Sequence, residues 1–189
     1  MKFEYKLTEI GWAKVLLEIN EKRFYSEPSY ISEPLIDLLE GVLSIIPGCV
    51  PDDELKTVAT FKWELEPAID KWTLILEDNN ILKIEVETYS DHTCTEKISN
   101  FKESCNLLEF IGEVINSLEQ LLQNHGLVGY KNFWDGYDFP ISSFLKLKYY
   151  LYNQEKYPTE ELVMDIYESE YEKSDIKEEL KFILSDPIK

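Results

Sequence analysis

The middle of the chain alternates apolar residues with mostly charged or polar ones, and this alternation is the feature that most constrains the fold. Between residues 61 and 87, three short runs place every second side chain on one face, as in half-buried β-strands. The apolar positions are Phe61, Trp63, Leu65, Trp72, Leu74, Leu76, Leu82, Ile84 and Val86. Turns over 67–70 and 78–80 separate the runs, and asparagine tolerates the positive φ of tight turns. We therefore predict an antiparallel three-strand meander with one apolar and one charged face.

The N-terminal segment predicts three more strands. Apolar and polar residues alternate over 2–7, and the alternation resumes over 13–19 after Gly11. A polar turn over 20–22 then leads to a short return strand over 23–26. With the meander, these runs predict an antiparallel sheet of about five or six strands.

A helix is predicted between these two groups of strands. We expect Ser32 to be its N-cap, Pro34 to lie in its first turn and Pro47-Gly48 to end it. After the meander, the residues over 90–104 are mostly polar and predict a loop.

The last part of the chain predicts three more helices. Apolar residues recur at helical spacing over 107–122, and Gly126 is the expected C-cap. The next helix covers 138–152, and the last begins at its expected N-cap, Thr159. The apolar residues assigned to this last helix are Leu162, Ile166 and Leu180.

The order of strands, helix, strands and helices predicts an α+β fold in which helices cover one face of an antiparallel sheet, followed by a helical C-terminal part. A length of 189 residues suits one domain. We expect residues 1–157 to form the α+β domain and residues 158–189 to be an acidic helical extension of it.

The chain is strongly acidic, with 37 acidic and 19 basic residues and a formal net charge of −18. Such a charge repels nucleic acid phosphates and anionic membranes, so neither is an expected partner. It attracts basic proteins, and it also keeps a protein soluble. The charge therefore leaves two interpretations open, a surface for a basic partner and a surface that only confers solubility.

The sequence predicts a cytoplasmic protein. Its first residues alternate in polarity and lack the apolar stretch of a signal peptide, and its apolar runs are far shorter than the roughly 20 residues that cross a bilayer. The three cysteines, Cys49, Cys94 and Cys105, form an odd set without CxxC spacing, which favours a reducing compartment.

The residue types used in metal and nucleophile chemistry are sparse. Residues 91–94 offer Asp, His and Cys, but Cys105 lies too far along the chain for a zinc motif. No GxSxG elbow is present, although Cys49 and His125 could still meet in space. Glycine-rich phosphate loops are also missing, so we expect neither a metal nor a nucleotide or flavin cofactor.

Carboxylates offer two candidate sites. Four of them are expected to share the outward face of the meander: Glu64, Glu66, Glu85 and Glu87. They form either an acidic surface for a basic partner or a solvated face whose negative charge is partly neutralised by Lys62 and Lys83. Separately, a hydrolase site would have to combine His125, Asp135 and Asp138.

Five aromatic residues fall within ten positions, at Tyr130, Phe133, Trp134, Tyr137 and Phe139. Tyrosine and tryptophan are enriched in binding hot spots, so this segment could be a recognition surface. The alternative is that these rings pack under the helices that the segment connects. The candidate partner-binding residues are Glu64, Glu66, Glu85, Glu87, Tyr130, Trp134, Asp135 and Tyr137.

Two stretches carry a resemblance to known sequences. The first combines Gly11-Trp12 with residues 28–39, and the second combines residues 125–130 with Trp134, Phe139-Pro140 and residues 145–148. In these stretches the chain resembles an uncharacterised family of small acidic bacterial proteins, which implies no activity and no residue role. In overall type it is also similar to immunity proteins, which neutralise bacterial toxins and lack catalytic residues.

We therefore predict a non-catalytic binding protein that inhibits a basic bacterial toxin by occlusion. A hydrolase with a site near His125, Asp135 and Asp138 is one alternative, and a self-associating structural protein is another. The oligomeric state stays open.

Overall fold

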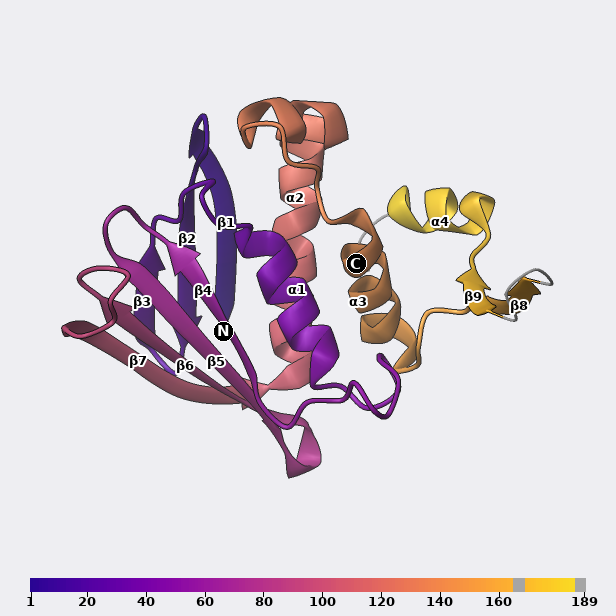
Figure 1. Cartoon of the computed structure of the whole chain (residues 1–189), viewed down its shortest axis with the longest axis horizontal. Helices are drawn as coiled ribbons and strands as arrows, with labels where there is room; N and C mark the ends of the chain where they lie inside the picture. The colour runs from indigo at the N-terminus through magenta and orange to yellow at the C-terminus, as the bar shows by residue number, and fades with distance from the viewer. Residues whose placement is uncertain (165–168, 186–189) are drawn as a thin grey trace.

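The computed structural model of the protein describes residues 1–164 and 169–185. Within them the fold is α+β, as predicted, with four α-helices and nine strands (Figure 1). The strands form three antiparallel sheets, in the orders β1-β2-β3, β4-β5-β6-β7 and β8-β9. The prediction of one sheet of five or six strands is thus refined to two main sheets and a separate hairpin.

The first sheet follows the predicted alternation at the N-terminus. Its strands are β1 (Lys2–Glu9), β2 (Trp12–Ile19) and β3 (Lys22–Ser26). The free edge of β1 is covered by the long helix α2 (Leu107–Phe133). On this edge the backbone N–H of Tyr5 donates to Ser117 Oγ at 2.7 Å. This N–H is therefore not free to pair with another strand.

The second sheet contains the predicted meander and one strand more. Its strands are β4 (Ala59–Glu64), β5 (Ile69–Glu77), β6 (Ile81–Tyr89) and β7 (Lys97–Asn106). Strand β7 corrects the predicted loop over 90–104. Of its residues only Phe101 is buried, opposite Val86 of β6, so an edge strand of polar residues shows no apolar alternation.

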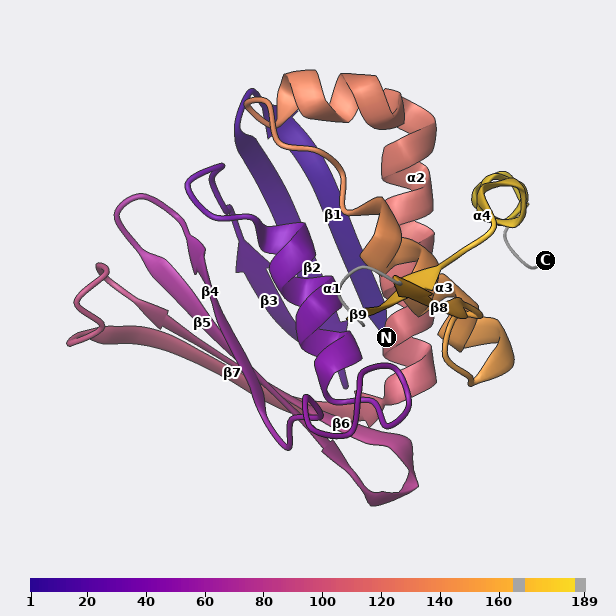
Figure 2. The same ribbon diagram turned by 45° about the vertical axis from the view of Figure 1, so that its right-hand side comes forward.

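Four α-helices complete the fold. They are α1 (Pro34–Ser44), α2, α3 (Ile141–Asn153) and α4 (Ile176–Ile183). Figures 1 and 2 place α1 in the angle between the two main sheets, with α3 beyond it and α4 beyond α3. Gly126 breaks the regular helix of α2 with φ 64°, but the helix resumes and continues to Phe133, past the predicted end.

The cap predicted for α1 is wrong. Glu33 is the N-cap residue and makes no side-chain capping bond. The hydroxyl of Ser32 instead accepts a hydrogen bond from the backbone N–H of Glu64, at 2.9 Å. Ser32 therefore ties the start of α1 to the end of β4, a tertiary role that local sequence does not show.

The predicted helix after Thr159 is also wrong over most of its length. This region forms a hairpin of β8 (Glu160–Met164) and β9 (Ser169–Lys173), and only then α4. The N-cap of α4 is Asp175, whose carboxylate accepts from the backbone N–H of Lys177 at 2.8 Å. Leu180 does lie on α4, whereas Ile166 is outside the described residues.

The two main sheets meet through an aromatic core and one buried acid. Phe24 of β3 packs edge-on against Trp72 of β5, with 5.5 Å between the ring centroids. Asp70, predicted to lie in a turn, is a buried residue of β5, and its carboxylate accepts from Ser26 at 2.5 Å and from Thr88 at 2.6 Å. Burial raises the pKa of this carboxyl.

Candidate functional site

The outward face of the four-stranded sheet is balanced in charge rather than acidic. Glu85 forms an ion pair with Lys102 at 3.0 Å, and Glu87 forms one with Lys97. The hydrogen bond from Lys97 lowers the pKa of the Glu87 carboxyl. Two of the four predicted carboxylates are thus neutralised by lysines of the neighbouring strand β7.

The other two predicted carboxylates lie at the opposite edge of this sheet. Glu64 ends β4, and Glu66 is exposed in the turn that follows. Their backbone is close to the start of α1, because the carbonyl of Glu64 accepts from the N–H of Ser29 at 2.7 Å. The structure therefore divides the predicted set into a lysine-paired half on β6 and a half beside α1.

Helix α1 and its N-cap carry carboxylates that were not among the predicted site residues. They are spaced along one side of the helix, at Glu33, Asp37 and Glu40. Among the described ion pairs, none involves these three residues. The signal for them was in the composition, since residues 24–55 hold seven acidic residues and no lysine or arginine.

The crowding of these carboxylates is reflected in the titration of Asp37. Partial burial, followed by the negative charges of Glu33 and Glu40, raises the pKa of its carboxyl to about 6. Like charges without counter-ions disfavour one another, so this side of α1 should bind cationic groups more readily than the lysine-paired sheet face does.

Most of the predicted aromatic surface is inside the protein. The rings of Tyr130 and Trp134 are buried and stack 6.4 Å apart, and Phe139 meets Tyr130 edge-on. The burial of Tyr130 and Trp134 therefore contradicts a partner-binding role for these two residues and agrees with the alternative, a packing role. Tyr137 is 42% exposed, and Asp135 is exposed in the same turn, so these two can still contact a partner.

The residues of the alternative hydrolase site do not meet in the cavity that His125 lines. His125 packs against Phe133, with 5.4 Å between the rings, and lines a cavity of about 200 Å³ together with Ser117 and Asn124. Neither Asp135 nor Asp138 lines this cavity. Asp138 instead forms an exposed ion pair with Lys131 at 2.7 Å.

The thiols do not suggest nucleophilic chemistry. Burial raises the pKa of Cys49 to about 11 and that of Cys105 to about 12, which keeps both in the protonated form. Cys94 lies in the loop before β7, with its Sγ atom 3.6 Å from the Lys62 ammonium. Among the described residues, no group of three or more His, Cys, Asp or Glu side chains is arranged to hold a metal ion.

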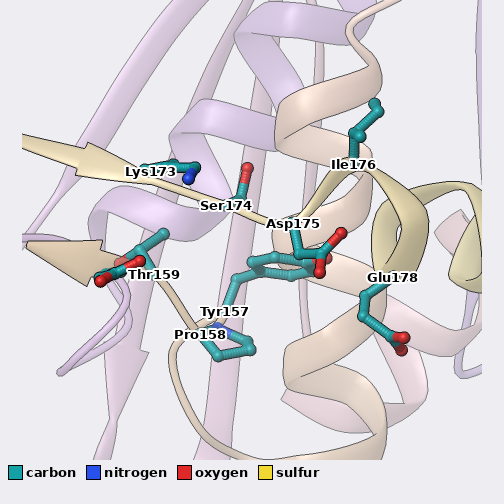
Figure 3. A pocket seen from close by; sticks show the side chains of 9 residues that line it. Tyr157, Pro158, Thr159, Lys173, Ser174, Asp175, Ile176 and Glu178 are labelled. Carbon is teal, nitrogen blue, oxygen red and sulfur yellow. The ribbon is translucent and has the colours of Figure 1, made fainter.

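The C-terminal part contains a cavity of about 560 Å³, where the β8–β9 hairpin meets the start of α4. Figure 3 shows the ring of Tyr157 in the middle, the carboxylate of Asp175 beside it, and Glu178 and Lys173 on opposite sides. Burial, with added repulsion from nearby carboxylates, raises the pKa of Tyr157. With Glu160, three carboxylates and one lysine line this cavity, so an aromatic ring and an excess of negative charge suit a cationic group.

A second C-terminal cavity is apolar. It has a volume of about 360 Å³ and lies between α2, α3 and α4. Its apolar side chains are Leu122, Leu127, Phe144, Ile183 and Leu184. Glu119, which also lines it, forms a buried ion pair at 2.8 Å with Lys148 of α3.

Comparisons of the chain with protein-family models, with curated proteins and with solved structures found no match. The resemblance to a family of acidic bacterial proteins and the similarity to immunity proteins therefore stay predictions. Within the described residues, no helix has the length and apolar character that crossing a bilayer requires.

Proposed function

We propose that the protein is a non-catalytic, cytoplasmic binding protein whose partner is a basic protein, and that it inhibits this partner by covering its surface. The observation that supports this proposal best is the row of carboxylates on α1 without basic partners, at Glu33, Asp37 and Glu40. A basic surface docked on this row would replace mutual repulsion by attraction.

The charge of the whole molecule adds to this local effect. A net charge of −18 accelerates encounters with a basic protein, because opposite charges steer diffusion. A toxin that acts on nucleic acid or on anionic surfaces is a natural partner of this kind, since it needs a basic surface for its own substrate. An acidic inhibitor that occupies such a surface competes directly with that substrate.

The two alternatives draw less support. A hydrolase at His125 would need Asp135 or Asp138 beside the imidazole, and neither lines its cavity. Self-association must bring together two copies that each carry a net charge of −18.

The proposal is tested by capture of the partner with the tagged full chain from a lysate of its source, at low and at high salt. We expect one basic protein to be retained in near-stoichiometric amount and released by salt. The triple substitution Glu33→Gln, Asp37→Gln and Glu40→Gln should slow its association. The matched control also removes three charges and changes Glu85, Glu87 and Glu103 to Gln, because lysines already neutralise these three carboxylates.

A lysate from which no basic protein is captured contradicts the proposal, and so does either of two results obtained with a captured protein. One is a retained protein that is acidic or that high salt does not release. The other is an equal change of association rate in the α1 variant and in the sheet control, which would mean that only net charge matters.

A further inference from the structure

Helix α4 exposes a stripe of large apolar side chains. Ile176, Leu180 and Leu184 are 62%, 51% and 81% exposed, although α4 packs against α3 through Phe182. Their spacing of four residues places them on neighbouring positions of one side of the helix. The apolar sector of α4 is therefore wider than the area that α3 covers, and an exposed stripe of this kind indicates an interaction surface.

This stripe connects the two C-terminal cavities. Ile176 lines the acidic cavity around Tyr157, and Leu184 lines the apolar cavity beside Leu127. Figure 3 shows Ile176 at the edge of the first cavity. The two ends of the stripe are eight residues apart, which is about 12 Å along a helix. A single elongated surface thus has an aromatic, acidic cavity at one end and an apolar cavity at the other.

We propose that this surface receives an amphipathic helix of the basic partner, an inference that rests on the proposed function. Apolar side chains of that helix cover Ile176, Leu180 and Leu184, and one of them enters the apolar cavity. A lysine or arginine side chain of the same helix lies over the ring of Tyr157, among Asp175 and Glu178.

Charge complementarity argues for this occupant over a second copy of the chain. The acidic cavity holds three carboxylates and one lysine, so it favours a basic segment. Two copies docked through α4 would instead bring two such cavities and two net charges of −18 together. A basic helix satisfies both the apolar and the charged part of the surface.

The two proposed contacts have different kinetic roles. The α1 carboxylates act at long range and affect the association rate, whereas buried apolar contacts on α4 affect the dissociation rate. In both Figures 1 and 2, α1, α3 and α4 follow one another across the molecule.

The test uses a fluorescein-labelled synthetic helix of leucine and lysine, with leucines at helical spacing, and measures its anisotropy with the full chain at physiological salt. The double variant Ile176→Ser with Leu180→Ser should bind this peptide about tenfold more weakly or worse. The matched control is Ile10→Ser with Ile98→Ser, since these residues are 70% and 59% exposed in the turn after β1 and on β7, and its affinity should stay unchanged. Circular dichroism checks that both variants keep their helix content.

A second pair of variants tests the acidic cavity without touching α4. Tyr157→Phe keeps the ring and should keep the affinity, whereas Tyr157→Leu should weaken binding severalfold. Equal affinities for the stripe variant and its control would overturn the inference. So would equal binding of a peptide with glutamate in place of lysine, or a dimer of the free chain that the stripe variant dissolves.

The natural partner separates this inference from the proposed function. If the stripe variant releases the captured basic protein no faster than the control does, the α4 surface is not the contact and the binding function stands. If no basic protein is captured at all, the binding function fails whatever the peptide does.

Discussion

Lys148 is a charged residue that joins three helices from a fully buried position. Its ammonium lies 2.8 Å from a carboxylate oxygen of Glu119 on α2 and donates to the carbonyl of Phe182 on α4, at 2.9 Å. We expect Lys148→Met to lower the free energy of unfolding by about 3–5 kcal/mol, because it leaves a buried carboxylate without its counter-ion. Urea denaturation measures this loss.

The companion variant of Glu119 shows whether the pair or the packing is responsible. Lys148→Met with Glu119→Leu removes both charges, so it should recover most of the stability lost in the single variant. A loss that is no smaller in the double variant would mean that the hydrogen bonds to α4, rather than the ion pair, stabilise this region.

Asp37 should make stability depend on pH. Its pKa is raised from 3.8 to about 6, so the folded state binds the proton more tightly than the unfolded state does. The resulting stabilisation is complete below pH 3.8 and is lost as the pH rises through about 6. Asp37→Asn should therefore be more stable than the native chain by about 1 kcal/mol at pH 7, with solvent screening taken into account, and should show no gain below pH 3.8.

Urea unfolding at the two pH values measures this difference. The control is Asp52→Asn, at an exposed position, which should leave the stability unchanged at both. An Asp37→Asn variant that gains as much stability at low pH as at neutral pH would show that its effect is not electrostatic.

Single residues were predictable where one local rule decides them. The alternation placed Trp63 and Trp72 on the inner face of the sheet, and both are buried. The same alternation, extended back from Trp72, puts Asp70 on that inner face, but aspartate so close to Pro67 also fits a turn. Ser32 fits the local preference for serine as a helix cap. Its actual hydrogen-bond partner is the backbone of Glu64, 32 residues away, and no local pattern indicates that contact.

At the scale of elements, two helical glycines allow a matched test of packing. A Cβ atom at Gly41 of α1 would lie 2.8 Å from the Phe61 ring of β4, whereas one at Gly112 of α2 would meet nothing nearer than 3.9 Å. Alanine favours a helix over glycine at both positions. We therefore expect Gly112→Ala to gain about 0.5–1 kcal/mol and Gly41→Ala to lose about 1–3 kcal/mol.

Thermal or urea unfolding of the two variants decides between packing and helix propensity. If Gly41→Ala is as stable as Gly112→Ala, the Phe61 ring moves aside freely and the close approach of α1 to β4 contributes little.

The elements that the sequence predicted are those whose own residues carry the pattern. The meander and α1 contain a complete apolar face, so their period is visible locally. Strand β7 buries only Phe101 and is held in place by its pairing with β6. The residues of β7 themselves therefore show no strand pattern. The β8–β9 hairpin was predicted as helix because Thr159 fits an N-cap and Leu162 fits the apolar side of a helix, and the strand pairing of this segment overrides those local signals.

At the scale of the whole molecule, charge could be predicted in amount but not in distribution. The composition gave the net charge of −18, and it led to the sheet carboxylates as the first candidates. Lys97 and Lys102 neutralise half of that set from a strand that the sequence did not predict. The sequence shows that no lysine or arginine lies near the α1 carboxylates along the chain. Only the fold shows that, among the described residues, no lysine or arginine from another segment forms an ion pair with them.

The net charge also predicts how salt changes stability. Two effects oppose each other, because salt weakens exposed ion pairs such as Lys102 with Glu85 and also screens repulsion among the excess carboxylates. Exposed pairs contribute about 0–1 kcal/mol each, whereas 37 acids against 19 bases leave many carboxylates facing like charge. Repulsion should dominate, so the free energy of unfolding in urea should rise by about 1 kcal/mol or more up to roughly 0.5 M NaCl.

The triple Gln variant of Glu33, Asp37 and Glu40 should show a smaller rise, since it starts with less repulsion. Stability that falls with salt would instead show that the ion pairs outweigh the charge excess. Repulsion among the carboxylates on α1 would then no longer support the binding of a basic partner there.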